Sequence, residues 1–155
     1  MLALTRKTEY ALIAVCHLAR TGAGVVSARD IAAEHRVPLP LLMNVLKLLT
    51  QGGHIRSVRG ARGGYALARP PTEINLASLI EAVEGPVQLV RCASPARPGR
   101  SACGLVSSCS IRHSVHRVHD RLRDFLSSVT VADVALDDGP LTAATDTAGP
   151  KVVAQ

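Results

Sequence analysis

Residues 27–67 read SARDIAAEHRVPLPLLMNVLKLLTQGGHIRSVRGARGGYAL, which divides into two helical segments and two short extended ones. Ser27 is an N-cap candidate for a helix over 28–35, because its hydroxyl can accept a backbone hydrogen bond from the first turn. The break at 36–38 separates that helix from a second one over 40–51, which has a leucine-rich face opposite a polar face. Two short helices joined by a tight turn predict a helix-turn-helix.

The residues after this pair of helices are predicted to form a β-hairpin, with strands over 54–58 and 65–67 and a loop over 59–64. A helix-turn-helix followed by a hairpin is a winged helix. The loop carries two arginines on a glycine-rich backbone, so its tip can approach a phosphate backbone or a minor groove. The glycines would equally serve an ordinary hairpin turn. The predicted DNA-contacting residues are Asn44, Lys47, Arg59, Gly60 and Arg62.

Length and charge restrict the classes of protein that the chain can belong to. It has 155 residues, 47% of them hydrophobic, which suits one domain with appendages. Its formal charge is +6, and residues 1–70 alone carry a net +7, which suggests a polyanion such as nucleic acid as partner. Charge alone slightly favours a merely soluble basic protein, so the sequence pattern has to decide between the two. No run of eighteen apolar residues occurs, so no membrane span is predicted. We interpret residues 5–20 as an amphipathic first helix and expect a cytoplasmic protein.

The second half of the chain is predicted to hold a short helix over 76–84 and, after a loop, a long helix. Apolar residues of the long helix recur at steps of 4, 3, 4, 3 and 4, a heptad rhythm that favours a dimer seam over packing onto the same chain. These residues are Ile111, Val115, Val118, Leu122, Phe125 and Val129.

The expected fold is mainly α: a winged helix-turn-helix with a small β-hairpin wing and a long C-terminal dimerisation helix. The predicted division is a winged-helix DNA-binding domain (1–70), a connecting helix (71–91), a cysteine-rich cluster-binding loop (92–109), a dimerisation helix (110–136) and a disordered tail (137–155).

Three cysteines, Cys92, Cys103 and Cys109, lie close together in the sequence, whereas Cys16 stands alone and is predicted to be buried. An odd number of cysteines cannot pair fully, and thiolates in a loop bind soft metals or iron–sulfur clusters. The spacing leaves zinc, an iron–sulfur cluster and a thiol redox switch open. His113 and Glu9 are the candidates for a fourth ligand.

An enzyme is the least favoured class. His113, His116, His119 and Asp120 lie near one another, but they lack a His-Glu-x-x-His pattern and share the helix that carries the heptad stripe. We expect His116 and His119 to lie on a solvated face or beside the seam. A protein–protein adaptor is disfavoured by the net +7 of residues 1–70 and by the two arginines of the wing.

Several motifs together resemble the Rrf-two family of bacterial transcription regulators, of the IscR/NsrR type. The resemblance covers about residues 1–136, and the hairpin motif placed between a helix-turn-helix and three cysteines is specific. The matching pieces are Leu4-Thr5, Thr8-Glu9-Tyr10-Ala11-Leu12, Asp30-Ile31-Ala32, Ser57-Val58-Arg59-Gly60, Gly63-Gly64-Tyr65-Ala66-Leu67 and Ala82-Val83-Glu84-Gly85-Pro86.

The resemblance implies a homodimer that binds a pseudo-palindromic operator, as a repressor or similar regulator, and senses redox, nitric oxide or iron status. It implies that Cys92, Cys103 and Cys109 ligate an iron–sulfur cluster, 2Fe–2S being preferred and 4Fe–4S the alternative. IscR-like members have a histidine three residues after the last cysteine, a place that Arg112 occupies here. NsrR-like members use a carboxylate of the other subunit near the amino terminus, and Glu9 stands at that position. The same fold using zinc or thiol oxidation is the alternative.

Overall fold

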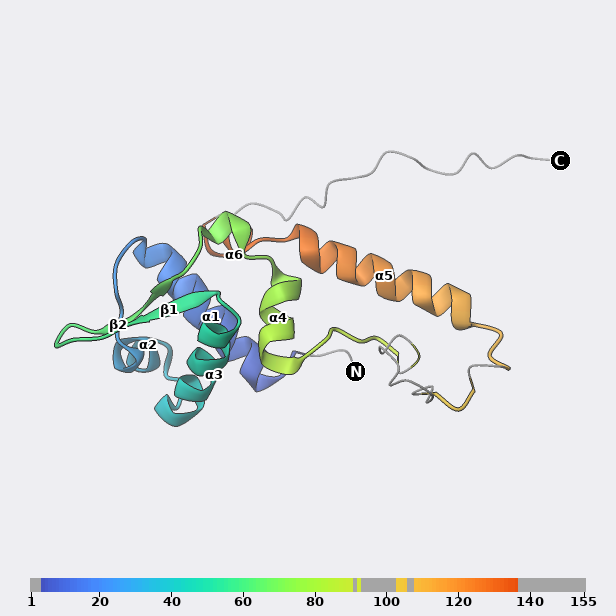
Figure 1. Cartoon of the computed structure of the whole chain (residues 1–155), viewed down its shortest axis with the longest axis horizontal. Helices are drawn as coiled ribbons and strands as arrows, with labels where there is room; N and C mark the ends of the chain where they lie inside the picture. Colours follow the sequence, from blue (N-terminus) through green and yellow to red (C-terminus); the bar gives the residue numbers. More distant parts are fainter. Residues whose placement is uncertain (1–3, 91, 93–102, 106–107, 137–155) are drawn as a thin grey trace.

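The computed structural model describes residues 4–90, 92, 103–105 and 108–136. Most of the predicted cysteine-rich loop and the whole predicted tail, 137–155, therefore lie outside the described residues. No helix in the described part of the chain is long and apolar enough to cross a membrane. The elements are α1 (Arg6–Thr21), α2 (Ala28–His35), α3 (Leu39–Gln51), β1 (Ile55–Val58), β2 (Gly64–Leu67), a short 3-10 helix η1 (Pro71–Glu73), α4 (Leu76–Glu84), α5 (Arg112–Ser128) and α6 (Val131–Ala135) (Figure 1).

The helix-turn-helix forms where the sequence predicts it. The Ser27 hydroxyl accepts a hydrogen bond from the Asp30 N–H at 3.1 Å and so begins α2, as expected of an N-cap residue. Pro40 lies in the first turn of α3, which begins one residue earlier than predicted. The leucine-rich face of α3 is buried, as predicted, through Leu42, Val45, Leu46 and Leu49.

The wing is a two-stranded antiparallel hairpin, and its strand limits shift by one residue from the prediction. Val26 and Tyr65 exchange two backbone hydrogen bonds, 2.9 and 2.8 Å long, so the chain before α2 lies along the hairpin. A Cβ on Gly64 would lie 2.3 Å from the Val26 carbonyl oxygen, and one on Gly63 would lie 2.5 Å from the Val58 oxygen. These two glycines therefore serve the packing of the hairpin itself, whereas Gly60, with φ +128°, has open space around it.

The core of the winged-helix body is aliphatic and lies between α1, α2, α3, α4 and α6. Cys16 is 8% exposed within it, which confirms that it is a small buried residue, and burial raises the pKa of its thiol. The short helix α6 packs on α1, where the Arg20 Nε donates a 2.9 Å hydrogen bond to the Ala135 carbonyl.

The predicted helix over 110–136 is two helices. α5 ends at Ser128, and Val129 is extended and only 5% exposed. Leu76 N–H donates to the Val129 carbonyl at 2.9 Å, after which Thr130 starts α6 through a capping box with Asp133. The assignment of Val129 to the heptad seam is therefore wrong. Strand-like pairing with the residues before α4 and a new N-cap are incompatible with a continuous helix.

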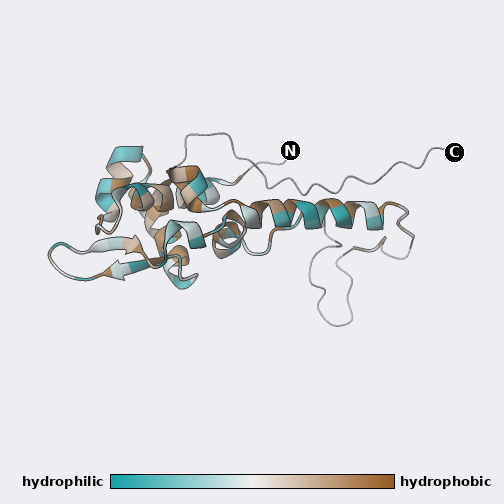
Figure 2. Cartoon of the chain, turned by 90° about the horizontal axis from the view of Figure 1, so that it is seen from above, coloured by the Kyte–Doolittle hydropathy of each residue, from teal (hydrophilic) through white to brown (hydrophobic). Residues whose placement is uncertain are grey.

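The rest of the heptad stripe is largely open to solvent. α5 projects away from the winged-helix body (Figure 1), and apolar and polar residues alternate along it in Figure 2. Ile111, Val118 and Phe125 are 62%, 56% and 42% exposed, respectively. α4 packs against α5, so part of the helix surface is covered by the chain itself.

Candidate nucleic-acid interface and cysteine segment

The polar face of α3 points outward. Asn44, Lys47 and Gln51 are exposed, because the leucine face of the same helix is held in the core. This arrangement presents amide and ammonium groups along one side of the second helix of the helix-turn-helix, which is the side that reads a major groove in proteins of this architecture.

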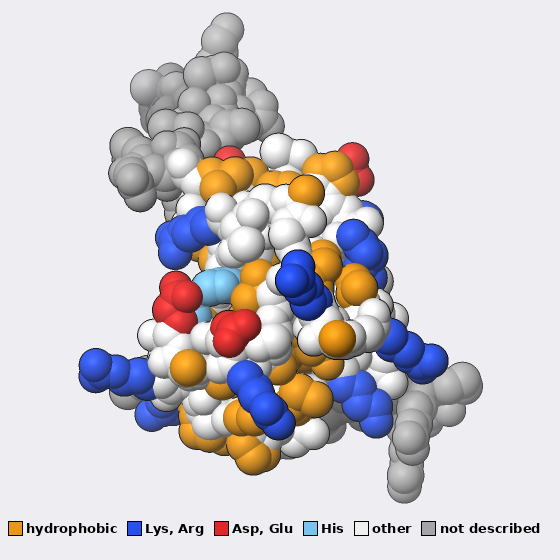
Figure 3. Space-filling model, turned by 90° about the vertical axis from the view of Figure 1, so that its left-hand side faces the viewer, with side chains coloured by type: hydrophobic (Ala, Val, Ile, Leu, Met, Phe, Trp, Pro, Cys, Tyr) orange, Lys and Arg blue, Asp and Glu red, His pale blue; other side chains and the backbone are white. Residues whose placement is uncertain are grey.

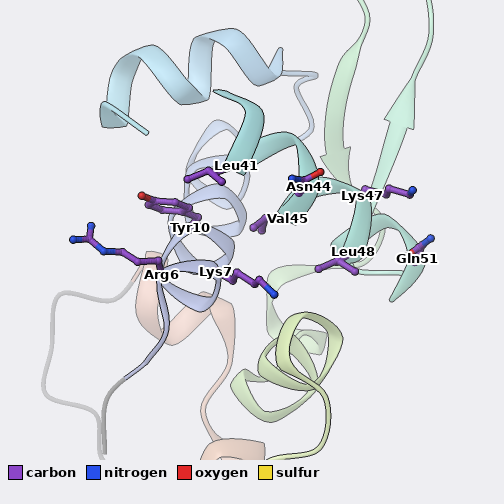
Figure 4. Close-up of a pocket in the computed structure, with 9 residues that line it drawn as sticks. All are labelled: Arg6, Lys7, Tyr10, Leu41, Asn44, Val45, Lys47, Leu48 and Gln51. Carbon is purple, nitrogen blue, oxygen red and sulfur yellow. The ribbon is translucent and has the colours of Figure 1, made fainter. Parts of the chain in front are cut away.

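The first turns of α1 lie beside α3. Figure 4 shows a pocket of about 460 Å³ to which α1 contributes Arg6, Lys7 and Tyr10. The α3 residues that line it include Asn44 and Lys47. Reasoning from the sequence missed this contribution from α1. The available signal was the pair of basic residues just before the apolar face of the first helix.

The predicted wing residues are also exposed. Arg59, Gly60 and Arg62 lie in the loop between β1 and β2, at the free end of the hairpin (Figure 1). Figure 3 shows Lys and Arg side chains distributed over the end of the molecule that carries the helix-turn-helix and the wing. The structure therefore places the wing arginines and the polar face of α3 at one positively charged end, which suits a nucleic-acid backbone.

The three clustered cysteines are half-buried. Glu9 lies in the first turn of α1, 48% exposed and 3.9 Å from the Arg6 Nε, and His113 is exposed in the first turn of α5. In the described part of a single chain, Cys92, Cys103 and Cys109 do not form a group of ligand atoms within 4.8 Å, with or without Glu9 or His113.

A carboxylate at the end of α4, before the segment that carries Cys92, Cys103 and Cys109, holds α4 to the start of α1. Glu84, the last residue of α4, accepts hydrogen bonds from the hydroxyls of Thr5 and Thr8, the latter at 3.4 Å. Thr5 is also the N-cap of α1. Glu84, eight residues before Cys92, therefore contacts the end of α1 that carries Arg6 and Glu9.

His119 does not lie on a solvated face. It is 6% exposed, and its Nδ1 accepts a 3.3 Å hydrogen bond from the Leu89 N–H, which holds the chain after α4 against α5. The solvated alternative for this residue is wrong because the segment after α4 folds back over α5, whereas its position beside the proposed seam stays a prediction. The Nε2 of His116 is also buried and has no hydrogen-bond partner within the part of the chain described.

A buried histidine that reasoning from the sequence missed holds the base of the wing to α4. His54 is 2% exposed; its Nε2 lies 3.1 Å from the Ser78 carbonyl oxygen, and its Nδ1 lies 3.0 Å from an Arg69 guanidinium nitrogen. The carbonyl can only accept and the guanidinium can only donate, so the neutral ring carries its proton on Nε2. Burial, with the Arg69 charge second, lowers the pKa of His54.

Comparison with known proteins agrees with this architecture. Residues 4–137 match the Rrf2 family, described as an iron-dependent transcriptional regulator. The chain is 32% identical over 133 residues to the HTH-type transcriptional regulator IscR of Pectobacterium carotovorum, covering 84% of this chain and 77% of the relative.

Two solved structures have the same fold. The structure of CymR, the global cysteine regulator of B. subtilis, has a TM-score of 0.70 and 29% identity, over 87% of this chain and 97% of that one. The structure of IscR from T. potens has a TM-score of 0.65 and 30% identity, over 86% and 85%. These relatives are transcriptional regulators, not enzymes. A winged helix with an outward polar recognition helix, matched over nearly its whole described length, identifies the chain as a member of the Rrf2 family of DNA-binding transcriptional regulators.

Proposed function

We propose that two copies of the chain bind a pseudo-palindromic operator in the bacterial cytoplasm, and that an iron–sulfur cluster held by Cys92, Cys103 and Cys109 controls this binding. The observation that carries the proposal is the set of three half-buried cysteines in one segment, in a chain whose family is described as iron-dependent. Cysteine thiolates are the donor type that iron–sulfur clusters take.

The donor set fits a cluster with three thiolates and one other ligand, for which 2Fe–2S is our preferred form. Because the three cysteines do not converge within one chain, the site needs a rearrangement of their segment or a second chain to complete it. We propose Glu9 of the partner subunit as the fourth ligand, with His113 as the alternative. The exposure of Glu9 supports this choice, since its contact with Arg6 in the described part of the chain is long, at 3.9 Å.

The exposed stripe of α5 supports the dimer. Ile111, Val118 and Phe125 lie on one heptad pattern, and the described part of the chain leaves them open to solvent. Pairing with α5 of a second copy would remove these side chains from water, as in other two-stranded helical seams. A dimer would also present two α3 helices to successive half-sites of one duplex.

The contacts of Glu84 support a route from the cysteine segment to the DNA-binding surface. A change in that segment would act on the end of α4, which Thr5 and Thr8 hold to the start of α1. Arg6 and Lys7 of that start line the pocket shared with α3. When bound, a cluster would supply chemistry that responds to oxygen, nitric oxide or iron supply. The residues of the chain would then convert its presence or loss into a different pose of the two recognition helices.

Anaerobic purification with iron and sulfide analysis tests the proposal directly. We expect coloured wild-type protein with visible absorption and bound sulfide, and colourless Cys103→Ser protein whose affinity for its operator differs from that of the wild type. Cys16→Ala is the matched control and should retain colour and sulfide, since Cys16 is buried in α1. Colourless wild-type protein, or unchanged spectra and DNA response in Cys103→Ser, would contradict the cluster.

The fourth ligand is decided by a second pair of variants. Glu9→Gln should alter the visible and resonance Raman spectra of the anaerobic protein, whereas His113→Gln should leave both unchanged. The reverse result would assign the role to His113. In either case the iron and sulfide content should remain above that of Cys103→Ser, because three thiolates are still present.

A thiol or zinc switch on the same fold is the second candidate. The likeness to CymR of Staphylococcus aureus, of which an oxidized form has been solved, favours it over unrelated functions. The same preparations separate the two: a sulfide-free, colourless chain that binds zinc, or that loses its free thiols on oxidation while its DNA affinity changes, would support the switch.

A further inference from the structure

Three side chains of metal-binding type meet between α1 and α2, far in sequence from the three clustered cysteines. They are His17, from the second half of α1, and Glu34 and His35, from the last turn of α2. The backbone of Arg36 adopts the left-handed conformation, with φ 53°, and its N–H bonds back to the Ala32 and Ala33 carbonyls. This cap stops α2 directly after Glu34 and His35, with their ligand atoms beside His17 of α1.

The three ligand atoms form a compact triangle. The Nδ1 of His17 lies 3.1 Å from the Nε2 of His35 and 3.4 Å from the Oε1 of Glu34. The third side, from the His35 Nε2 to the Glu34 Oε1, is 3.9 Å. Ligands bound at about 2.0–2.1 Å to a tetrahedral zinc ion lie about 3.4 Å from one another. The observed triangle therefore matches one face of such a tetrahedron after movements of a few tenths of an ångström.

A hydrogen bond between the two rings satisfies these atoms less well than a cation would. If one of the two ring nitrogens carries a proton, that N–H can donate a hydrogen bond to one of the other two atoms. The lone pairs of the atoms that receive no proton still face each other. The rings stand edge to face, with centroids 5.2 Å apart and an interplanar angle of 89°, so their nitrogens converge on one point without stacking. A divalent cation at that point would be bound by both rings and the carboxylate at once.

The burial of the three groups suits a metal site that opens to solvent on one side. The side chains of His17 and His35 are 12% and 26% exposed, whereas that of Glu34 is 62% exposed. The two nitrogens are thus partly shielded from water, and the carboxylate lies at the mouth. Three protein ligands with one open position leave room for a water molecule as fourth ligand.

We infer that His17, Glu34 and His35 bind a divalent transition-metal ion of the zinc class, which joins α1 to α2. Two imidazoles and a carboxylate suit Zn²⁺, and Co²⁺ and Ni²⁺ bind the same donors. α2 leads into α3 through residues 36–38 only. An ion at this position would hold the first helix of the helix-turn-helix against α1, and so restrict the orientation of the recognition helix.

The test uses the full chain without an affinity tag, because histidine tags bind the same metals. To remove thiolate binding, the background variant carries Cys92→Ser, Cys103→Ser and Cys109→Ser. We expect this variant to bind one Co²⁺ per chain with the absorption of nitrogen and oxygen ligands, and Zn²⁺ to displace the Co²⁺. Zn²⁺ should also raise its melting temperature, since a ligand that binds the native state alone stabilises it.

Two ligand variants in that background locate the ion. Glu34→Gln and His35→Gln should each weaken Zn²⁺ binding by about tenfold or more and remove the rise in melting temperature. Glu73→Gln, which replaces an exposed carboxylate in η1, is the matched control and should change neither. The inference is overturned if the background variant binds no metal, or if both ligand variants bind it as tightly as the control.

Imidazole resonances of the wild-type chain give a second readout that does not depend on the cysteine substitutions. On addition of Zn²⁺, the ring signals of His17 and His35, assigned from His17→Gln and His35→Gln, should shift together and saturate within one equivalent beyond the Zn²⁺ that the three clustered cysteines bind. If these signals stay in place, the two rings form only a hydrogen bond and no metal site exists between α1 and α2.

Discussion

In the winged-helix body, large aliphatic side chains such as Leu18, Ile31 and Leu46 have no exposed surface at all within a single chain. Along α5, Val118 and Phe125 are 56% and 42% exposed, although their heptad spacing is as regular as any pattern in the body. The body therefore completes its core from its own residues, whereas α5 presents an apolar face that the described chain does not cover. The first region holds the core of the fold and is proposed to contact DNA, and the second is proposed to assemble two copies.

The first expected effect is on assembly. Phe125→Ala removes an aromatic ring from each of two proposed partners. Because Phe125 is 42% exposed in the single chain, burying the rest of the ring contributes roughly 0.6–1.3 kcal/mol per copy. The dimer should weaken by about 1.3–2.5 kcal/mol, which raises its dissociation constant by roughly eight- to seventyfold. Sedimentation over a range of concentrations measures this. Met43→Ala, which shortens an apolar side chain exposed on α3, should leave the dimer intact. Equal dimerisation of the two variants would show that α5 is not the seam.

The next effect concerns the stability of the body. Leu46→Ala leaves a cavity in a fully buried position and should lower the free energy of unfolding by about 2–5 kcal/mol, measured by urea denaturation. Leu41→Ala is the matched control in the same helix, where the side chain is 50% exposed, and should change stability by about 0.5 kcal/mol or less. Similar losses in the two variants would mean that α3 is not anchored by its leucine face.

A smaller effect, on DNA affinity, tests whether the winged-helix body contacts DNA and α5 does not. Arg59→Ala should weaken binding to every duplex sequence and reduce the slope of log affinity against log salt by about one unit, because one phosphate contact is lost. Arg121→Ala removes an exposed arginine from α5 and should leave the slope unchanged. If the Arg59 variant kept the wild-type slope, the wing would not be part of the DNA footprint.

The smallest effect is a pH dependence that arises in the body. The pKa of His54 is lowered below its ordinary value of 6.5 by burial and by Arg69. The unfolded chain therefore takes up the proton first as pH falls below 6.5. Stability is fully present above that pH and is lost as pH falls toward the pKa of the folded state.

Urea unfolding between pH 7.5 and pH 5 checks this dependence, and the loss on acidification should be smaller in His54→Gln. Arg69→Ala tests the cause, because removing the neighbouring charge should raise the pKa of His54 in a ring-resonance titration. A steeper acid loss in His54→Gln than in the wild type would be incompatible with a neutral His54.

Local patterns account for the parts of the fold that were predicted well. The Ser27 cap, the bounds of α2 and α4 and the buried face of α3 depend on neighbouring residues, whose spacing and caps are visible in the sequence. The exposed position of Lys47 follows from the helical periodicity of α3, and that of Arg59 from its place in the hairpin loop. Their predicted roles, like those of the cysteines, stay predictions that the proposed experiments test.

Features that depend on distant partners were not predicted. The end of α5 is decided by the pairing of Val129 with the backbone at Leu76, and the burial of His54 by Ser78 and Arg69. Likewise, the contact of Glu84 with Thr5 joins residues that are 79 positions apart. Local periodicity does not predict which carbonyl or hydroxyl group a side chain will bond to after the elements pack.

The sequence by itself determined the winged helix, its basic half and the three clustered cysteines, because helical period, capping and charge act over a few residues. Only the tertiary structure decided that α1 and α3 line one exposed pocket and that α6 is a helix separate from α5. It alone also brought two histidines and a glutamate together between α1 and α2. Those outcomes depend on which surfaces of separate elements bury each other, and that choice is made by packing across the whole chain.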